Sequence, residues 1–385
     1  MSIRKRVWST SEGKACSAWQ ASYTDASGRR RTKQFVKKRE AEIWLSQTRV
    51  EVVDGTHVPE RVSISIAEMA DKWLGRLRQD GRERSTLKSY EEIVRLHLAP
   101  RLGWTLVSKL TRSQVEHWCD HLSASRSKAT AKKSLVALKA LLNEAVRLGF
   151  AGRNVASSVR VKIAARERQA LAVPSRDELR RLLDAAEGPI RCFLLLAITC
   201  GLRSSELRGL QWGDIDLVRR LVHVRRRADQ WNVLGPPKSA AGVRTIPLPV
   251  PVCLELETFR GACRDGDLVF ASSSGTPISP SNLARRMFKP LQLRAGVFAL
   301  HRNDKGAPVV GSNGEWWLTG KYKLHALRHA AASNWIAAGV DLKRLQVWLG
   351  HSSVQMTIDR YGHLMRDEHR DAELVNSASQ DLLDS

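Results

Sequence analysis

Hydrophobic and polar residues change their spacing several times along this chain of 385 residues. Near the N-terminus, Trp19, Ala21 and Tyr23 alternate with other residues, and this period of two is typical of a β-strand with one buried face. A stretch that contains Gly28 then favours a turn, and a second short strand follows. The pattern predicts a β-hairpin over residues 18–36.

The spacing next changes to that of an amphipathic helix over residues 38–53, which Gly55 closes. The residues expected on its buried face are Ala41, Trp44, Leu45 and Thr48. The hairpin and this helix together predict a first domain over residues 1–57.

Residues 63–152 show helical spacing throughout and predict a module of four helices. Thr111 and Gln114 form a capping box ahead of the third helix, and the fourth ends at Gly149. We expect the second helix to start at Ser85. The predicted buried residues are, in helix order, Ile66, Met69, Trp73 and Leu77; Leu87, Tyr90, Ile93 and Val94; Val115, Trp118, Cys119 and Leu122; and Leu135, Leu138, Leu142 and Ala145.

Residues 153–173 are rich in Arg and Lys and poor in large apolar residues, so we expect a linker there. The capping pair Ser175 and Glu178 then opens a third domain over residues 174–366, which is mostly helical. Two short strands are expected within it, at residues 221–224 and 243–248. The predicted fold class is therefore mainly α with small β-sheets: a β-hairpin plus helix, a four-helix module and an α-rich third domain with a small sheet.

Composition narrows the class of partner. The chain has 63 basic and 39 acidic residues, and the resulting charge of +24 attracts a polyanion over a large surface. No apolar run approaches the roughly 18 residues of a membrane span, and no secretory signal is visible, so we expect a cytoplasmic protein without a membrane partner. The six cysteines are scattered without the spacing of a zinc site, and we expect reduced, mostly buried thiols.

Basic residues concentrate in two regions of the N-terminal half. Seven of the twelve residues from 29 to 40 are basic, and we interpret the excess as phosphate contacts, with a solvated turn as the alternative. Exposed cations near helix starts in the four-helix module are placed to follow a DNA backbone. The residues chosen as DNA contacts are Arg29, Arg30, Arg31, Lys33, Arg84, Lys88, Lys128 and Lys132.

The third domain contains groups suited to phosphodiester transfer. Transfer to a tyrosine needs a nucleophile, cations on the two non-bridging oxygens and a proton donor for the leaving oxygen. The first candidate is Arg203 in the string GLRSSEL, at the start of a helix that we expect Ser204 or Ser205 to cap. Glu206 is placed to hold its guanidinium by an ion pair.

The proton donor is expected in the segment PPKSAAGVRTIPL. We interpret Lys238 as the tip of a hairpin between two strands, with Gly242 permitting the turn. From such a tip its ammonium group is able to reach a leaving 5′ oxygen and protonate it.

Two further motifs complete the set. HALRH places His325 and Arg328 three residues apart on one helix face, while His329 falls on an adjacent side and is interpreted as structural. No HExxH motif and no carboxylate ligands accompany these histidines, so we expect no metal. LGHSSVQMTIDRYGHL supplies His351 and Tyr361, and a tyrosine near a C-terminus becomes a candidate nucleophile only because the other groups precede it.

In residue type, order and spacing, Arg203, Lys238, His325, Arg328, His351 and Tyr361 resemble the active-site set of the tyrosine recombinases, the phage integrase family. The resemblance implies a DNA strand-transfer enzyme that needs no ATP, metal or other cofactor. Residues 63–152 resemble the core-binding domain of the family, and residues 1–57 resemble its arm-binding domain in layout.

The resemblance also assigns roles. Tyr361 would attack a phosphate to give a 3′-phosphotyrosyl link and a free 5′-hydroxyl. Arg203 and Arg328 would neutralise the transition state, and His351 would bond a non-bridging oxygen. Lys238 would protonate the leaving oxygen, with His325 as its acid/base partner. The working unit would be a homotetramer on two double-stranded DNA sites that passes through a Holliday junction, in the nucleoid of a bacterial host.

Two segments lie outside these motifs. An insert at residues 299–323, with Trp316 and Trp317, is interpreted as an extended β-loop without an assigned role. The segment 367–385 predicts a tail helix that packs either on a neighbouring protomer or on its own domain. Its apolar strip consists of Ala372, Leu374, Val375, Leu382 and Leu383.

Two other functions remain open at this point. A type IB topoisomerase shares the tyrosine chemistry, although the two N-terminal modules favour site recognition and hence recombination. A DNA-binding regulator that has lost catalysis is the second, and the six competent residues argue against it. The target sequence, the direction of recombination, any accessory DNA-bending or directionality factor, and a phage or integrative-element origin are not encoded in these patterns.

Overall fold

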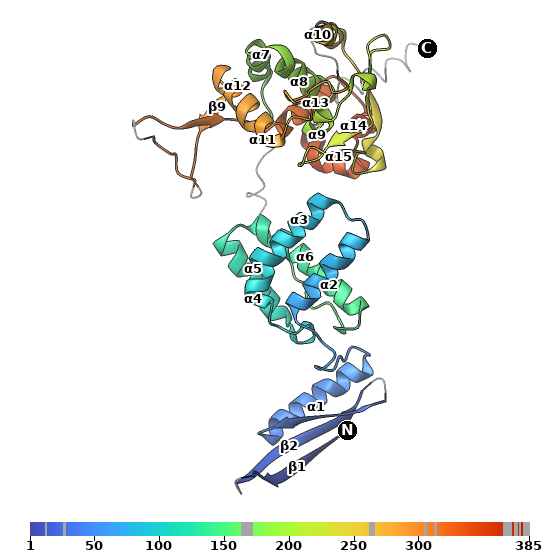
Figure 1. Ribbon diagram of the computed structural model, residues 1–385, viewed down its shortest axis with the longest axis vertical. Helices are drawn as coiled ribbons and strands as arrows, with labels where there is room; N and C mark the ends of the chain where they lie inside the picture. The colour runs from blue at the N-terminus through green and yellow to red at the C-terminus, as the bar shows by residue number, and fades with distance from the viewer. Residues whose placement is uncertain are drawn as a thin grey trace. The chain divides into compact units, whose positions relative to one another are not determined.

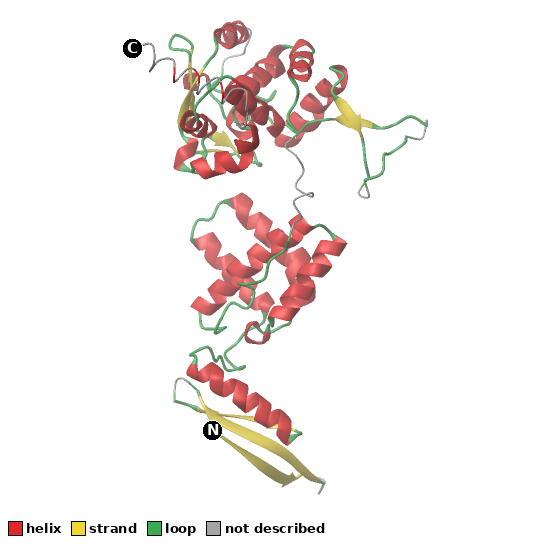
Figure 2. Cartoon of the chain, turned by 180° about the vertical axis from the view of Figure 1, so that it is seen from behind, coloured by secondary structure: helices red, strands yellow, loops and turns green. Residues whose placement is uncertain are grey.

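The computed structural model describes residues 1–364 except 12–13, 26–27, 163–171, 262–265, 304–305 and 312–313, together with residues 372, 376 and 379. The chain divides into two compact units, Met1–Arg168 and Gln169–Ser385. Helices dominate, and the strands are confined to small sheets (Figure 2). The predicted fold class, mainly α with small β-sheets, is confirmed.

The first unit begins with an antiparallel sheet of three strands in the order β1-β2-β3. These are β1 (Ser2–Ser9), β2 (Ala15–Thr24) and β3 (Arg30–Phe35), followed by helix α1 (Lys38–Val53). The predicted hairpin is β2 and β3, and α1 has the predicted bounds. Strand β1 was not predicted, because this edge strand is largely exposed and lacks the alternation of apolar and polar residues. Ala21 and Tyr23 of β2 are buried, as are Ala41 and Thr48 of α1.

The helical module follows in the same unit and is coloured cyan to green in Figure 1. Its elements are α2 (Ile66–Gln79), α3 (Arg84–Ile93), a π-helical turn (Val94–Leu98), α4 (Ala99–Leu102), a 3-10 turn (Val107–Lys109), α5 (Arg112–Ser125) and α6 (Lys128–Arg147). The capping box of Thr111 and Gln114 is present. The predicted buried faces of α5 and α6 are confirmed.

The second helix of the module differs from the prediction. It begins at Arg84, and the π-helical turn extends it, so that Leu98 is fully buried. Of the four residues predicted to be buried there, Ile93 is buried, whereas Leu87, Tyr90 and Val94 are partly exposed. A π turn contains an extra residue and rotates the side chains that follow it, so regular helical spacing does not anticipate the burial of Leu98.

The start of the predicted linker was also wrong, because this part of it folds onto the module. Ala156 and Val159 are buried in the helical core. Lys139 Nζ donates hydrogen bonds of 3.0 and 2.8 Å to the carbonyl oxygens of Ser157 and Val159. Small residues were sufficient for this packing, so the lack of large apolar residues was a misleading signal. Residues 163–171 of the predicted linker lie outside the described residues.

The second unit starts with the predicted cap of Ser175 and Glu178. Its helices are α7 (Arg176–Asp184), α8 (Gly188–Thr199), α9 (Ser204–Arg208), α10 (Val250–Gly261), α11 (Pro280–Asn282), α12 (Lys289–Arg294), α13 (His325–Ala337), α14 (Leu342–Leu349) and α15 (Val354–Tyr361). A π-helical segment, Leu283–Phe288, joins α11 to α12, and 3-10 turns lie at Trp212–Asp214, Ala240–Gly242 and Gly362–Leu364. The apolar α8 lies in the main core and packs against α10 and α13.

Small sheets complete this unit. β4 (Ile215–Asp216), β5 (Leu221–Val224) and β8 (Arg244–Pro247) form one, and β6 (Arg227–Ala228) and β7 (Leu234–Gly235) form a second. Both strands predicted from the sequence are present, as β5 and β8.

The insert forms the predicted β-loop. β9 (Phe298–Leu300) pairs antiparallel with β10 (Leu318–Gly320), and Figure 1 shows the ribbon extending from the helices of its unit. Trp316 and Trp317 are exposed on it. The predicted tail helix cannot be followed, because most of residues 365–385 lie outside the described part of the chain.

Candidate active site

Arg203 occupies the N-cap position of α9. The cap is not Ser204 or Ser205, as expected, but the carboxylate of Glu206, which accepts the backbone N–H of Arg203 at 2.8 Å. The same carboxylate accepts a hydrogen bond of 2.7 Å from Arg203 Nη1, which is the predicted ion pair. A single glutamate therefore fixes both the backbone and the side chain of Arg203.

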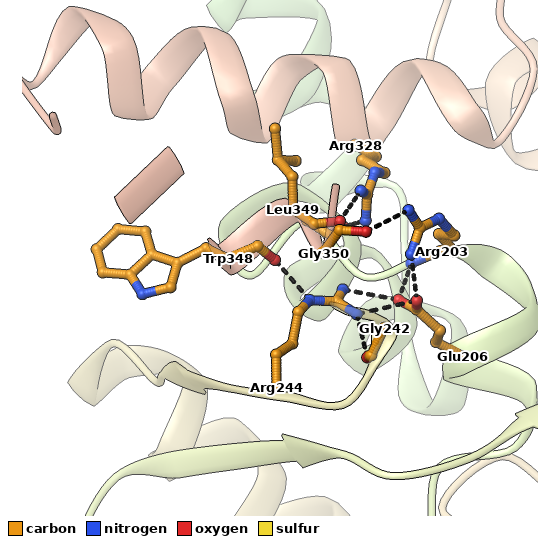
Figure 3. Close-up of polar contacts among 9 residues, drawn as sticks. Arg203, Glu206, Gly242, Arg244, Arg328, Trp348, Leu349 and Gly350 are labelled. Carbon is orange, nitrogen blue, oxygen red and sulfur yellow. Dashed lines mark hydrogen bonds and ion pairs between the residues drawn. The ribbon is translucent and has the colours of Figure 1, made fainter. Parts of the chain in front are cut away.

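Glu206 is also the partner of Arg244, an arginine on β8 that the sequence analysis did not select. The two guanidinium nitrogens of Arg244 donate to the two carboxylate oxygens at 3.0 and 2.8 Å, a bidentate pair (Figure 3). Glu206 is 3% exposed and Arg244 is 6% exposed. Although burial opposes ionisation, Arg244, Arg203 and Arg328 hold the pKa of Glu206 down at about 2. The carboxylate is thus ionised at neutral pH.

Arg328 lies on α13 beside this network. Its guanidinium donates to the carbonyl oxygen of Gly201 at 2.8 Å and to that of Leu349, and it is 2% exposed. Arg203 Nη2 donates to the next carbonyl, that of Gly350, at 3.2 Å. Figure 3 shows both guanidinium groups directed at this turn, just before His351. The two arginines predicted to bind one phosphate are therefore held together before any DNA arrives.

Burial and the neighbouring Arg203 lower the pKa of Arg328 to about 9, with Glu206 acting in the opposite direction. The guanidinium is still a cation at neutral pH. A buried cation that is held by carbonyl oxygens keeps much of its charge available to an incoming phosphate.

Lys238 does not lie where the sequence predicted. It lies at an exposed bend in the connection from β7 to β8, and these two strands belong to different sheets rather than to one hairpin. Gly242 has no left-handed backbone there. A Cβ on Gly242 would lie 2.4 Å from the Cβ of Pro237, so close approach explains the glycine. The carbonyl of Gly242 accepts from Arg244 at 3.0 Å, which ties this connection to the Glu206 network.

Tyr361 is the last residue of α15 and is 1% exposed. Its hydroxyl lies 2.7 Å from Nδ1 of His329 on α13. His329, which the sequence analysis interpreted as structural and on an adjacent side of the helix, therefore contacts the candidate nucleophile. Helical spacing separated His329 from His325 and Arg328, but it did not reveal that α15 meets α13 on that side.

Two other histidines contact this pair, His351 through Tyr361 and His325 through His329. The His351 ring is stacked nearly parallel to that of Tyr361, with centroids 6.5 Å apart, and its Nδ1 lies 2.9 Å from the hydroxyl oxygen of Thr357. The His325 ring meets the His329 ring edge-on at 4.5 Å. The structure therefore brings five of the six predicted residues into one region, while Lys238 lies on a connection fixed to it.

Burial, together with the neighbouring positive charges, keeps all three histidines neutral. Burial, followed by neighbouring arginines, lowers the pKa of His351 to about 4. Burial and then His325 and Arg360 do the same for His329, also to about 4. His325 is exposed overall, yet the atoms around its ring and then Arg328 lower its pKa to about 4 as well. At neutral pH each imidazole therefore has one N–H donor and one nitrogen that can accept a hydrogen bond.

Tyr361 itself resists ionisation in this state. Burial raises the pKa of its hydroxyl above the usual 10, and the cations Arg328, Arg360 and Arg203 only partly offset that effect. A phosphate can reach the hydroxyl only after the atoms that cover it have moved, because so little of the residue is exposed.

A second buried arginine was missed by the sequence analysis. Arg208 of α9 donates to the carbonyl oxygens of Ala228 and Asp229 at 3.2 and 2.9 Å and to the side chain of Asn232 at 2.6 Å. It thereby anchors the hairpin of β6 and β7 to the helix that follows Arg203.

The burial of Arg244, in contrast, could have been predicted from the sequence. Strand alternation places Arg244 on the same face of β8 as the apolar Ile246, which is buried.

The predicted DNA contacts fall into two groups. Arg29, Arg30, Arg84, Lys88, Lys128 and Lys132 are exposed. Arg31 instead pairs with Asp25 at 2.8 Å, and Lys33 pairs with Glu60 and lies 5.4 Å from the ring centre of Trp44. Arg31 and Lys33 are therefore already engaged in ion pairs within the first unit.

Other site types are absent from the described residues. Nowhere in those ranges do three His, Cys, Asp or Glu side chains gather as metal ligands. None of the helices in the same ranges has the length and apolar character needed to cross a membrane. Of the described cysteines, Cys119, Cys192, Cys200 and Cys253 are buried and Cys16 is partly exposed, all as free thiols.

Comparison with known proteins identifies the family. The model of the phage integrase family matches residues 174–368, just over half of the chain. A tyrosine recombinase XerC-like protein of Caldanaerobacter subterraneus subsp. tengcongensis is 24% identical over 383 residues, covering 90% of this chain and 92% of that protein. A putative prophage phiRv2 integrase of Mycobacterium tuberculosis is 27% identical over 368 residues, covering 92% and 90%.

Solved structures agree in fold. The Tn1549 transposon integrase in complex with transposon right end DNA superposes with a TM-score of 0.67 at 20% identity, covering 82% of this chain and all of that chain. A lambda integrase tetramer bound to a Holliday junction superposes with a TM-score of 0.57 at 19% identity, covering 90% and 95%. These findings confirm the resemblance and do not favour a topoisomerase or an inactive regulator. The chain therefore belongs to the phage integrase family and is a tyrosine recombinase, an enzyme that cleaves and rejoins DNA through a covalent tyrosine intermediate.

Proposed function

We propose that Tyr361 is the nucleophile of this recombinase and that Arg203 and Arg328 bind the phosphate it attacks. The observation that carries the proposal is that both arginines bond carbonyl oxygens of one turn, at Leu349 and Gly350, while Tyr361 packs in one cluster with Leu349. In the reaction the Tyr361 oxygen forms a bond to phosphorus, and the bond from phosphorus to the 5′ oxygen breaks.

The remaining predicted residues transfer protons or bind the phosphate. Lys238 protonates the leaving 5′ oxygen from its exposed connection, with His325 as its partner. His351 donates to a non-bridging oxygen. The phosphotyrosyl bond conserves the energy of the phosphodiester, so rejoining needs no ATP. No step of the proposed mechanism uses a metal ion.

The partner is double-stranded DNA that carries core-type and arm-type attachment sites. Residues 63–152 bind the core site, and Arg84, Lys88, Lys128 and Lys132 contact its backbone. Residues 1–57 bind the arm site, with Arg29 and Arg30 exposed for phosphates. Residues 160–173 connect these modules to the catalytic domain, 174–366.

The assembly is a homotetramer on two DNA sites that passes through a Holliday junction. In support, a lambda integrase of similar fold is known as a tetramer on such a junction. The enzyme integrates or excises a phage genome or another mobile element in the cytoplasm of a bacterial host, associated with the nucleoid. Accessory DNA-bending or directionality factors set the direction.

A nicked suicide substrate tests this function. The wild-type protein is expected to form a covalent adduct with the DNA, visible on a denaturing gel, and Tyr361→Phe is expected to form none. The Phe variant retains the ring, so its affinity for the DNA should stay within a few fold of wild type. Binding without any adduct in the wild-type protein contradicts the catalytic proposal, and a large affinity loss in the variant makes Tyr361 structural.

A further inference from the structure

Arg208 lies on the same short helix as Glu206, but its side chain contacts a different part of the catalytic unit. The residue is 3% exposed, and its guanidinium donates four hydrogen bonds within the unit. The acceptors are oxygen atoms of Ala228, Asp229, Asn232 and Ile278. Three of these four acceptors belong to the hairpin of β6 and β7, residues 227–235.

The turn of this hairpin is closed by Asp229, whose carboxylate accepts the backbone N–H groups of Trp231 and Val233 at 2.8 and 2.9 Å. A Cβ on Gly209, the residue after α9, would lie 2.7 Å from the carbonyl carbon of Arg227 in β6. The hairpin is therefore a closed turn that lies directly against the end of α9.

The hairpin leads directly into the connection that carries Lys238. Only Pro236 and Pro237 stand between the end of β7 and this lysine. A proline ring fixes its own φ and restricts the residue before it, so this segment is stiff. The position of β7 therefore determines where the backbone of Lys238 lies.

The other end of the same connection is held from α9 as well. The carbonyl oxygen of Gly242 accepts a hydrogen bond of 3.0 Å from Arg244, and Arg244 pairs with Glu206 of α9 (Figure 3). Helix α9 thus holds the chain before Lys238 through Arg208 and the chain after it through Glu206.

From this arrangement we propose that Arg208 is a positioning residue for Lys238, because it fixes, through the β6–β7 hairpin, where the ammonium group lies relative to the phosphate at Arg203. This inference rests on the proposed role of Lys238. As the bond from phosphorus to the 5′ oxygen breaks, that oxygen takes a proton from Lys238, which is left as a neutral amine. Arg208 takes no part in the proton transfer.

Such a transfer depends strongly on distance. A proton donor must come within about 2.6–3.2 Å of the oxygen that it protonates. A misplacement of about 1 Å can slow a reaction by roughly 10²-fold. An exposed lysine has a long, mobile side chain, so the backbone that carries it must already be in place. The contacts of Arg208 provide this placement.

A direct contact between Arg208 and DNA is the alternative, and the burial of the residue argues against it. Burial lowers the pKa of the guanidinium to about 10, with Asp229 acting in the opposite direction, so it is still a cation at neutral pH. Its hydrogen bonds all go to oxygens inside the catalytic unit. Arg208 therefore acts on the reaction through the segments that it holds.

The experiment uses the full chain and two nicked substrates that differ in one atom, with oxygen or sulfur at the bridging 5′ position. A thiolate leaves without a proton donor, so the sulfur substrate bypasses the acid. Arg208→Ala is the test variant, and Lys238→Ala is the reference for a lost acid. Leu256→Ala, at a fully buried residue of α10, is the control for a general loss of packing.

We expect Arg208→Ala to slow adduct formation on the oxygen substrate by about 10-fold or more. On the sulfur substrate its rate should lie within a few fold of wild type. In a double variant with Lys238→Ala, the rate on oxygen should equal that of Lys238→Ala alone, because an absent acid cannot be misplaced. Leu256→Ala should show the same fraction of the wild-type rate on both substrates.

Three results overturn the inference. One is an Arg208→Ala rate on oxygen within a few fold of wild type. The second is equal slowing on both substrates, which assigns the loss to the phosphate or the nucleophile. The third is an additive double variant, since Arg208 then acts independently of Lys238. If sulfur does not rescue Lys238→Ala, the proposed acid role itself fails; rescue of Lys238→Ala without rescue of Arg208→Ala defeats the inference alone.

A milder variant covers the case in which Arg208→Ala does not fold or bind DNA. Asn232 has a left-handed backbone with φ 65°, which glycine adopts readily. Asn232→Gly therefore keeps the turn and removes one acceptor of Arg208. We expect it to be several-fold slower on oxygen and to be rescued by sulfur. A wild-type rate on oxygen, or slowing that sulfur does not rescue, overturns the inference.

Discussion

The cations of the two units are used in opposite ways. In the catalytic unit, Arg244 and Arg328 are buried, and each has several hydrogen-bond partners that fix its guanidinium. In the helical module, Lys128 and Lys132 are exposed at the start of α6. The arginines of the catalytic unit thus fix the geometry of its site, whereas the exposed lysines of the helical module provide long-range attraction for an anionic partner. A buried guanidinium needs carboxylate or carbonyl oxygens that accept its hydrogen bonds, whereas the ammonium group of a surface lysine can remain hydrated.

The strongest way to break this comparison is to remove the carboxylate of Glu206, which Arg244 and Arg203 share. Glu206→Ala leaves the buried Arg244 without its carboxylate, which we expect to destabilise the catalytic unit by about 3–5 kcal/mol. Adduct formation should be lost as well, because Glu206 also holds Arg203. Hydrogen exchange measured in α9 and β8 of the full chain gives the local loss of stability.

Glu91→Ala is the matched control for that measurement. It removes the partner of Arg78 in an exposed pair, which we expect to cost roughly 0–1 kcal/mol. Equal losses in the two variants would show that burial of the Glu206 network does not matter, and the contrast between the units would disappear.

Acidification tests the same buried region through its histidines. The pKa values of His329 and His351 lie at about 4 in the folded protein, below the ordinary value of about 6.5. Between about pH 4 and pH 6.5 the unfolded chain therefore binds more protons than the folded protein. The contribution of these neutral histidines to the free energy of unfolding is fully present above about pH 6.5 and is lost as the pH falls toward 4. The melting temperature of the catalytic unit should decline across this window.

Substitution of these histidines should flatten that decline. A variant with His329→Asn and His351→Gln has no imidazole to protonate at either position, so its melting temperature should depend less on pH. His121→Gln, a change at an exposed histidine of α5, is the control and should leave the slope unchanged. A double variant as pH-sensitive as wild type would assign the acid sensitivity to other groups. Glu206, with a pKa of about 2, stays ionised throughout this window.

The smallest effect is expected from the surface cations. Removing Lys128 and Lys132 together should lower the slope of log affinity against log salt concentration by about 1.8, if each contacts one phosphate. The stability of the protein should not change, since both side chains are exposed. Fluorescence anisotropy with a core-site duplex at several salt concentrations measures the slope. An unchanged slope removes these two lysines from the DNA interface.

The residues predicted from the sequence illustrate where local patterns suffice. The caps at Ser175 and Thr111 and the buried faces of α5 and α6 follow from side chains a few residues apart, and all are present. The prediction for Lys238 failed for the converse reason. Its segment has the composition of a turn, but strand pairing with β5 and β6 separates β7 from β8, and that pairing is not a local property.

The sequence by itself determined which chemical groups this recombinase has, their order along the chain, and the helices that carry most of them. Only the tertiary structure decided which groups meet. Glu206 and Arg244 are 38 residues apart, and His329 and Tyr361 are 32 apart, yet each pair is in direct contact. Helical and strand periodicity indicates which face of an element is buried, but the element that covers that face is selected by packing over the whole unit. Tyr361 could thus be found in the sequence, whereas its contact with His329 could not.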